Sequence, residues 1–155
     1  MRTPLVAGNW KMNGTRSSVA ELVQGIVAGA EASNDVEILV CPSFIFLSQV
    51  QALIETSTVA LGAQDLYVEQ DGAYTGEISG PMLRDAGCQY VIVGHSERRA
   101  LMGEGNDIVA RKFDAAQAEG LIPILCVGET LEERKADSTL NVIGSQFSAV
   151  VDAVG

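Results

Sequence analysis

Short apolar runs rich in β-branched residues alternate with helical patterns five times along this 155-residue chain. The runs are mostly continuous, and such runs are typical of strands buried on both faces of a parallel sheet. Regular alternation of strand and helix predicts an α/β protein built around one parallel sheet. The five predicted strands are residues 5–7, 36–40, 59–61, 90–93 and 122–126.

Hydroxyl residues stand where the intervening helices are expected to begin. Ser18 and Glu21 have the spacing of a capping box, and Thr130 and Glu133 repeat it. Apolar residues at helical spacing follow Ser18, which predicts an amphipathic helix there. Ser43 and Ser79 are further candidate N-caps.

The length of the repeating unit favours two architectures. The five βα units average about 31 residues, as do those of an eight-unit barrel of about 250 residues. Residues 1–155 are predicted to form a single domain, and the unit length is compatible with an incomplete barrel of about five βα units. A small doubly wound, metabolite-binding protein has similar units, and only the order of the strands in the sheet separates it from a barrel.

Composition excludes several classes of partner. The chain carries 10 Lys and Arg against 20 Asp and Glu, a net charge of −10. Such acidity argues against nucleic acid and against anionic membrane surfaces, since both require a basic face. No stretch of about 18 apolar residues predicts a transmembrane helix, and the first residues do not resemble a signal peptide.

The three cysteines do not form a recognisable site. Cys41, Cys88 and Cys126 lie far apart in the sequence, and their odd number fits poorly with a disulfide framework. We therefore expect reduced thiols, a cytoplasmic location and no metal site. Neither a glycine-rich dinucleotide fingerprint nor a Walker loop occurs, so the sequence gives no support for a nucleotide cofactor.

Candidate functional residues follow the predicted strands, where parallel α/β proteins place their sites. Asn9 and Lys11 are two residues apart after the first strand and are expected to point to the same side. An ammonium group beside an amide suits an anionic ligand. A solvated lysine beside a turn asparagine is the alternative interpretation.

His95, the only histidine, follows the fourth strand and precedes Ser96, a candidate N-cap. The positive end of a helix dipole opposes a second proton on a histidine there, so we expect a neutral imidazole. Such a ring can donate a hydrogen bond to a carbonyl oxygen, although a histidine that only caps the helix is equally consistent. For Arg98 and Arg99 we expect a solvated helical turn or a structural ion pair.

Three motifs together indicate a family. Residues 8–13 (Gly-Asn-Trp-Lys-Met-Asn), 94–99 (Gly-His-Ser-Glu-Arg-Arg) and 126–130 (Cys-Val-Gly-Glu-Thr) resemble triose-phosphate isomerases, as does the loop 72–77. The match runs the length of the chain, in order and at the family's spacing. The resemblance implies a homodimeric (βα)8 barrel that interconverts dihydroxyacetone phosphate and glyceraldehyde 3-phosphate without a cofactor. This is a step of glycolysis and gluconeogenesis.

The resemblance also implies roles for individual residues. Asn9 and Lys11 would bind the substrate, and Lys11 would balance the charge of the phosphate and of the enediolate. His95 would be the neutral electrophile on the carbonyl, a role for which this isomerase is itself the standard example. Glu97 would join the polar network beside Lys11 and His95.

Two further residues would support the site. Cys126 would lie behind it and help packing and orientation, although buried inert thiols are common. Thr75, in the loop 72–77, would reach the site of the partner subunit.

One expected element is missing from these residues. The family's general base is a glutamate in a Glu-Pro-Val-Trp-like segment after a sixth strand, and no such segment occurs here. Loss of a positioned base costs about 10²–10⁴-fold in rate, so we expect the chain alone to be inactive. The alternative is a non-catalytic half-barrel that acts as an assembly or interaction module, because unclosed sheet edges invite pairing.

Overall fold

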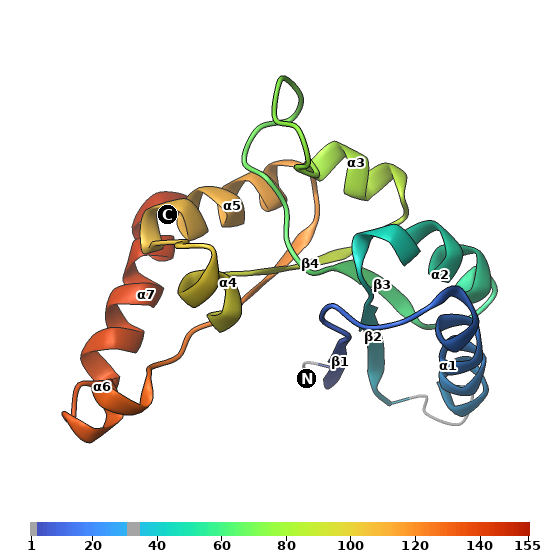
Figure 1. Cartoon of the computed structure of the whole chain (residues 1–155), viewed down its shortest axis with the longest axis horizontal. Coiled ribbons are helices and arrows are strands. Elements are labelled where there is room, and N and C mark those ends of the chain that lie inside the picture. The colour runs from blue at the N-terminus through green and yellow to red at the C-terminus, as the bar shows by residue number, and fades with distance from the viewer. Residues whose placement is uncertain (1–2, 31–34) are drawn as a thin grey trace.

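The computed structural model describes residues 3–30 and 35–155 and shows five parallel strands in one curled sheet (Figure 1). Their order is β1-β2-β3-β4-β5, and each strand pairs with the next in the chain. This sequential order confirms the half-barrel and is inconsistent with the doubly wound alternative, in which later strands return to both sides of the first.

The strands lie close to their predicted positions. They are β1 (Leu5–Asn9), β2 (Glu37–Cys41), β3 (Ala60–Ala63), β4 (Tyr90–Val93) and β5 (Ile122–Leu125). Pro123 stands second in β5, near the start of the strand, where a missing N–H is tolerated. The strands all run the same way, so their carboxyl ends gather at one rim of the half-barrel.

Helices cover the outer face of the sheet and connect its strands (Figure 1). α1 (Arg16–Ala30) follows β1, and a 3₁₀ turn (Phe44–Phe46) leads into α2 (Leu47–Ile54). α3 (Gly80–Asp85) precedes β4. The remaining helices flank β5, namely α4 (Ser96–Leu101), α5 (Asn106–Ala118), α6 (Leu131–Lys135) and α7 (Thr139–Val154).

The caps predicted for the helices that follow β1 and β2 are wrong. α1 begins at Arg16, so Ser18 lies inside the helix, where its backbone N–H donates to Thr15 Oγ1 and its own hydroxyl accepts from Thr15 N. Ser43 makes no side-chain cap and instead donates to the carbonyl of Lys11. A serine can serve a helix start from more than one position, so spacing alone does not locate the first residue.

Two other predicted caps are present. The hydroxyl of Ser79 accepts from the backbone of α3. The Thr130 hydroxyl and the Glu133 side chain form the reciprocal capping box of α6. These contacts satisfy backbone N–H groups that have no partner inside the helix.

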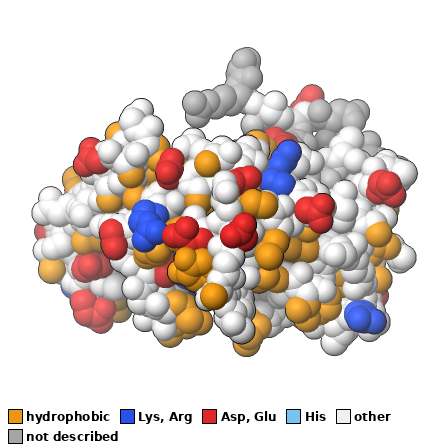
Figure 2. Space-filling model, turned by 90° about the horizontal axis from the view of Figure 1, so that it is seen from above, with side chains coloured by type: hydrophobic (Ala, Val, Ile, Leu, Met, Phe, Trp, Pro, Cys, Tyr) orange, Lys and Arg blue, Asp and Glu red, His pale blue; other side chains and the backbone are white. Residues whose placement is uncertain are grey.

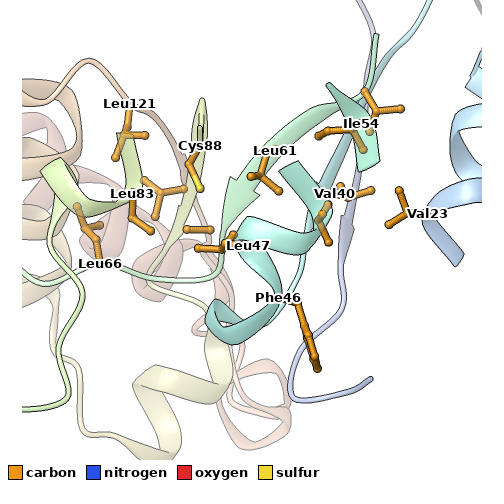
Figure 3. Packing of buried hydrophobic residues seen from close by; sticks show 14 of the residues in the cluster. Val23, Val40, Phe46, Leu47, Ile54, Leu61, Leu66, Leu83, Cys88 and Leu121 are labelled. Atoms are coloured by element: carbon orange, nitrogen blue, oxygen red, sulfur yellow. The ribbon is translucent and has the colours of Figure 1, made fainter. Parts of the chain in front are cut away.

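Apolar side chains fill the layer between the strands and the surrounding helices (Figure 3). Val40 and Leu61 come from the sheet, whereas Val23 and Leu47 come from α1 and α2. A second cluster belongs to the strands and lies apart from this layer, and it consists of Leu39, Cys41, Ala60, Tyr90 and Ile92. The central strands thus bury both faces, which holds the carboxyl ends of β2, β3 and β4 in fixed relation.

The outer strands do not meet the expectation of two buried faces. In β1 the side chain of Val6 is 61% exposed, and in β5 that of Ile122 is 51% exposed. Within the described residues β1 pairs only with β2, and β5 only with β4. An outer strand has neighbours on one side only, so an apolar run predicts a strand without predicting what covers it.

The surface in Figure 2 carries acidic side chains spread among apolar ones, with fewer basic groups between them. Among the described residues, no helix is both long and apolar enough to cross a bilayer. That residues 1–155 form one domain remains a prediction.

Candidate active site

Residues from the carboxyl ends of three strands line one cavity of about 470 Å³. Asn9 ends β1, Gln64 follows β3, and His95 follows β4. Lys11 and Glu97 complete its polar lining, while Met12 and Leu101 contribute apolar surface. The fold thus brings together four of the six predicted site residues, Asn9, Lys11, His95 and Glu97.

The backbone of Lys11 takes an unusual conformation. Its φ is +54°, a left-handed value that is uncommon for a residue with a side chain. Asn9 Oδ1 accepts from Lys11 N at 3.0 Å, and the Lys11 carbonyl accepts from Ser43 Oγ and Gln64 Nε2 at 2.8 and 2.9 Å. These three hydrogen bonds hold a conformation that costs about 1–3 kcal/mol and persists only where the surroundings impose it.

Asn9 and Lys11 do lie on the same side, as predicted, but the reason given for it, a shared strand face, is wrong. β1 ends at Asn9, so the alternation of side chains along a strand does not reach Lys11. Both residues line the same cavity because of the left-handed turn, not because of strand geometry.

Lys11 and Glu97, which both line this cavity, form an ion pair. Lys11 Nζ lies 2.6 Å from Glu97 Oε1, and each side chain is about half exposed. The hydrogen bond from Lys11, opposed by partial desolvation, lowers the pKa of Glu97. The carboxylate is thus ionised at neutral pH and holds the ammonium group over the cavity.

His95 is itself the N-cap of α4, which corrects the assignment of that role to Ser96. Its Nδ1 accepts from the backbone N–H of Glu97 at 3.2 Å, and Ser96 is the first residue of the helix. A neutral ring whose Nδ1 accepts carries its proton on Nε2. The imidazole is mostly buried, with 22% of its side chain exposed, and its Nδ1 lies 3.6 Å from Glu97 Oε2.

Cys126 and Thr75 lie outside this cavity. Cys126 follows β5 and packs against the inner strand cluster, and burial raises its pKa. Thr75 lies in the loop that projects between β3 and α3 (Figure 1), where it lines a smaller cavity with Tyr74 and Met82. Their predicted supporting roles stay predictions.

Gln64, Asp65 and Ser43 were not predicted as site residues from the sequence, although Ser43 was a candidate helix cap. Gln64 bridges two carbonyls, donating to Lys11 O and to Cys41 O at 2.9 Å each. The available signal was their position, because each stands three or four residues after the end of a predicted strand. Within the described ranges, no cluster of three or more His, Cys, Asp or Glu could hold a metal ion.

Residues 4–155 match the family model described as triosephosphate isomerase. The chain belongs to the triosephosphate isomerase family. A triosephosphate isomerase of Psychromonas ingrahamii is 52% identical over 155 residues, which are all of this chain and 62% of the relative. One from Magnetococcus marinus is 53% identical over 150 residues, covering 96% of this chain and 59% of the relative.

A solved structure shares the fold. The triosephosphate isomerase of Bartonella henselae superimposes with a TM-score of 0.90 at 43% identity, covering 96% of this chain and 62% of that protein. The chain thus spans somewhat less than two thirds of the triosephosphate isomerases it matches.

Proposed function

We propose that this chain carries the substrate-binding and carbonyl-polarising part of a triosephosphate isomerase, an intramolecular oxidoreductase that interconverts dihydroxyacetone phosphate and glyceraldehyde 3-phosphate. The supporting observation is the grouping of Lys11, Glu97 and His95 in one cavity of a chain that belongs to this family. Glycolysis and gluconeogenesis in the cytoplasm are the setting proposed for it.

The residues supply complementary functions. Lys11 places a positive charge where a phosphorylated triose needs one, and Asn9 adds an amide. His95 donates the proton on Nε2 to the substrate oxygen as negative charge develops on it, and then takes it back. Glu97 positions Lys11, because the ion pair between them restrains the ammonium group of the lysine side chain.

Proton removal from carbon requires a further group. Among the described residues, Glu97 and Asp65 are the carboxylates that line the cavity. Lys11 holds Glu97, and Lys112 holds Asp65 with both carboxylate oxygens at 2.8 and 2.7 Å. Neither is available as a base, so we propose that the 155-residue chain alone does not turn over substrate.

A chimera tests this function. Residues 1–155 would be joined to the segment of the Psychromonas relative that this chain does not match, and the rate of conversion of dihydroxyacetone phosphate would be measured. We expect turnover in the chimera, a loss of at least about 10²-fold in Lys11→Met and His95→Gln, and none in the 155-residue chain. A folded chimera without activity, or variants as active as their parent, would contradict the proposal.

The matched control in the chimera is Lys135→Met. Lys135 is an exposed lysine at the end of α6, so this change removes the same charge away from the cavity. Equal losses in Lys11→Met and Lys135→Met would show that net charge, and not the position of Lys11, explains the effect.

A second proposal concerns assembly. The exposed apolar residues on β1 and β5 favour pairing of these strands with another chain, through which the fragment would act as an interaction module. For the whole enzyme we propose a homodimer formed through the loop 72–77, which carries Thr75. Sedimentation of the isolated chain tests the proposal that β1 and β5 pair with another chain.

A further inference from the structure

α4 is the helix that His95 caps, and apolar packing does not hold it. It is six residues long and has no buried residue. Its last apolar side chain, Leu101, is 75% exposed. A short helix without a buried face is marginal by itself, so polar contacts must hold this one in place.

Arg98 connects α4 to the β3 side of the half-barrel. Its Nε lies 2.7 Å from Glu104 Oε1 and 2.9 Å from Asp65 Oδ2. Asp65 comes two residues after β3, and Glu104 lies in the loop between α4 and α5. One guanidinium group therefore holds the helix against two separate segments.

The partners of Arg98 are themselves immobilised. Asp65, Glu104 and Lys112 are all buried, and Lys112 Nζ lies 2.7 Å from both carboxylates. Burial raises the pKa of Asp65, whereas in Glu104 the effect of burial is outweighed by Lys112 and Arg98, which lower the pKa. Two cations and two carboxylates form a balanced cluster, and an exposed pair would hold Arg98 far less firmly.

Arg99 connects the same turn to the β5 side. Its Nε donates to the carbonyl of Gly94 at 2.8 Å, and its Nη1 and Nη2 donate to Asn106 Oδ1 and to the carbonyl of Cys126 at 2.8 and 3.4 Å. Gly94 is the residue before His95 and has a φ of +70°. A Cβ on Gly94 would lie 2.9 Å from Arg99 Nη2, so the arginine packs directly on that backbone.

Both arginines also meet His95 through their backbones. The N–H groups of Arg98 and Arg99 donate to the His95 carbonyl at 2.9 and 3.1 Å. The peptide groups on either side of His95 are thus held by two adjacent residues whose side chains are anchored on opposite flanks. A catalytic imidazole needs this restraint, because small misplacements of a reacting group cost large factors in rate.

We propose that Arg98 and Arg99 are positioning residues that fix the backbone and ring of His95 from two sides. The proposal rests on the proposed function for its catalytic meaning, since only there does His95 contact the substrate. The claim that the two arginines restrain His95 depends only on the contacts described above. The contrary expectation is that these arginines stabilise the fold without affecting the histidine.

The chain has a single histidine, so its imidazole signals in an NMR spectrum report on His95 alone. In the 155-residue chain we expect Arg98→Gln and Arg99→Gln to shift and broaden the His95 ring signals. We also expect the Glu97 amide, which donates to the ring, to lose protection from hydrogen exchange. Arg99→Lys keeps the charge and loses the fork of donors, so it should show the same change as Arg99→Gln.

Two controls separate positioning from stability and charge. Val50→Ala weakens the core at α2, where Val50 is fully buried, and should leave the His95 signals in place. Arg111→Gln removes an exposed charge from α5 and should do the same. His95 signals that shift equally in these controls, or that stay unchanged in folded Arg98 and Arg99 variants, would overturn the proposal.

A milder variant decides the matter if the arginine variants fail to fold. Asn106→Ala removes one acceptor of Arg99 and also a contact of Asn106 with Ser145, and Ser145→Ala removes only the second. We expect a smaller shift of the His95 signals in Asn106→Ala and none in Ser145→Ala, and identical spectra would refute the proposal. No substrate is involved, so an inactive chimera would count against the proposed function alone.

Discussion

Lys11 Nζ and Glu97 Oε1 lie 2.6 Å apart although 86 residues separate them in the chain. Lys11 follows β1 and Glu97 lies in the first turn of α4, so the curvature of the sheet brings the two elements together. The contact places a cation beside His95 without placing a free carboxylate there. This pair is the centre of the proposed site.

The ion pair between Lys11 and Glu97 lowers the pKa of Glu97, and this effect can be tested. Lys11→Met should raise the pKa of Glu97 toward its ordinary value, because the hydrogen bond from Lys11 is the main cause of its depression. A lowered pKa stabilises the fold above the ordinary value of 4.5, and this contribution is lost as the pH falls through the depressed pKa. The Glu97 carboxyl carbon, followed by NMR, reports the change, and Lys135→Met should leave it alone.

Lys112 should be among the most sensitive positions for stability. It is buried between Asp65 and Glu104, so Lys112→Met leaves two buried carboxylates with Arg98 as their one remaining cation among the described residues. We expect a loss of about 3–5 kcal/mol in the free energy of unfolding by urea. The exposed Lys135→Met should cost less than about 0.5 kcal/mol. Similar losses in the two variants would show that the buried cluster contributes little.

Gly62 stands where the sheet leaves no space. A Cβ there would lie 2.8 Å from Cys41 Sγ and 3.0 Å from Leu39 Cδ1. Gly62→Ala should therefore cost about 1–3 kcal/mol of unfolding free energy through overpacking. Gly25→Ala in α1 is the control, since its Cβ would meet nothing within 4 Å and alanine favours a helix by up to about 1 kcal/mol. A neutral Gly62→Ala would refute this account.

Tyr90 should titrate late. Its hydroxyl donates to Glu37, and this bond together with burial raises its pKa to about 12. A raised pKa stabilises the fold fully below pH 10, and the contribution is lost between pH 10 and about 12. The phenolate absorbance that Tyr90→Phe removes should therefore appear near pH 12. If Tyr90→Phe instead removes a phenolate absorbance that appears near pH 10, the hydrogen bond from Tyr90 to Glu37 is contradicted. The variant Tyr74→Phe, titrated in the same way, is the comparison.

The isolated 155-residue chain should associate in solution. Val6 and Ile122 expose apolar surface on β1 and β5, whose outer edges are unpaired within the described residues. We expect sedimentation to show species larger than a monomer, and Val6→Lys with Ile122→Lys to reduce their share. A monodisperse monomer with cooperative unfolding would refute the proposal that these edges pair.

Much of the fold could be predicted from local patterns. The run 90–93 coincides with β4, and the other four strands begin or end within two residues of the predicted runs. Burial of both faces was correct for β3 and β4 and wrong for β1 and β5, because apolar runs do not show which strand stands at an edge. The sequential strand order followed from the family resemblance, since repeat length alone allowed two topologies.

The candidate site was less accessible to sequence reasoning. The motifs located Lys11, His95 and Glu97, but the left-handed turn at Lys11 depends on Ser43 and Gln64, which follow β2 and β3. Likewise, Arg98 was expected to be a solvated residue or part of an ion pair, and only the structure shows Asp65 as its partner.

The sequence by itself determined which segments form strands and helices, which residues follow each strand, and to which family they belong. These properties depend on apolar periodicity and on motifs only a few residues long. The tertiary structure alone decided which of those residues meet. Contacts such as that of Gln64 with the Lys11 carbonyl join positions 53 residues apart, and they exist only once the register and curvature of the sheet have brought strand ends to one rim.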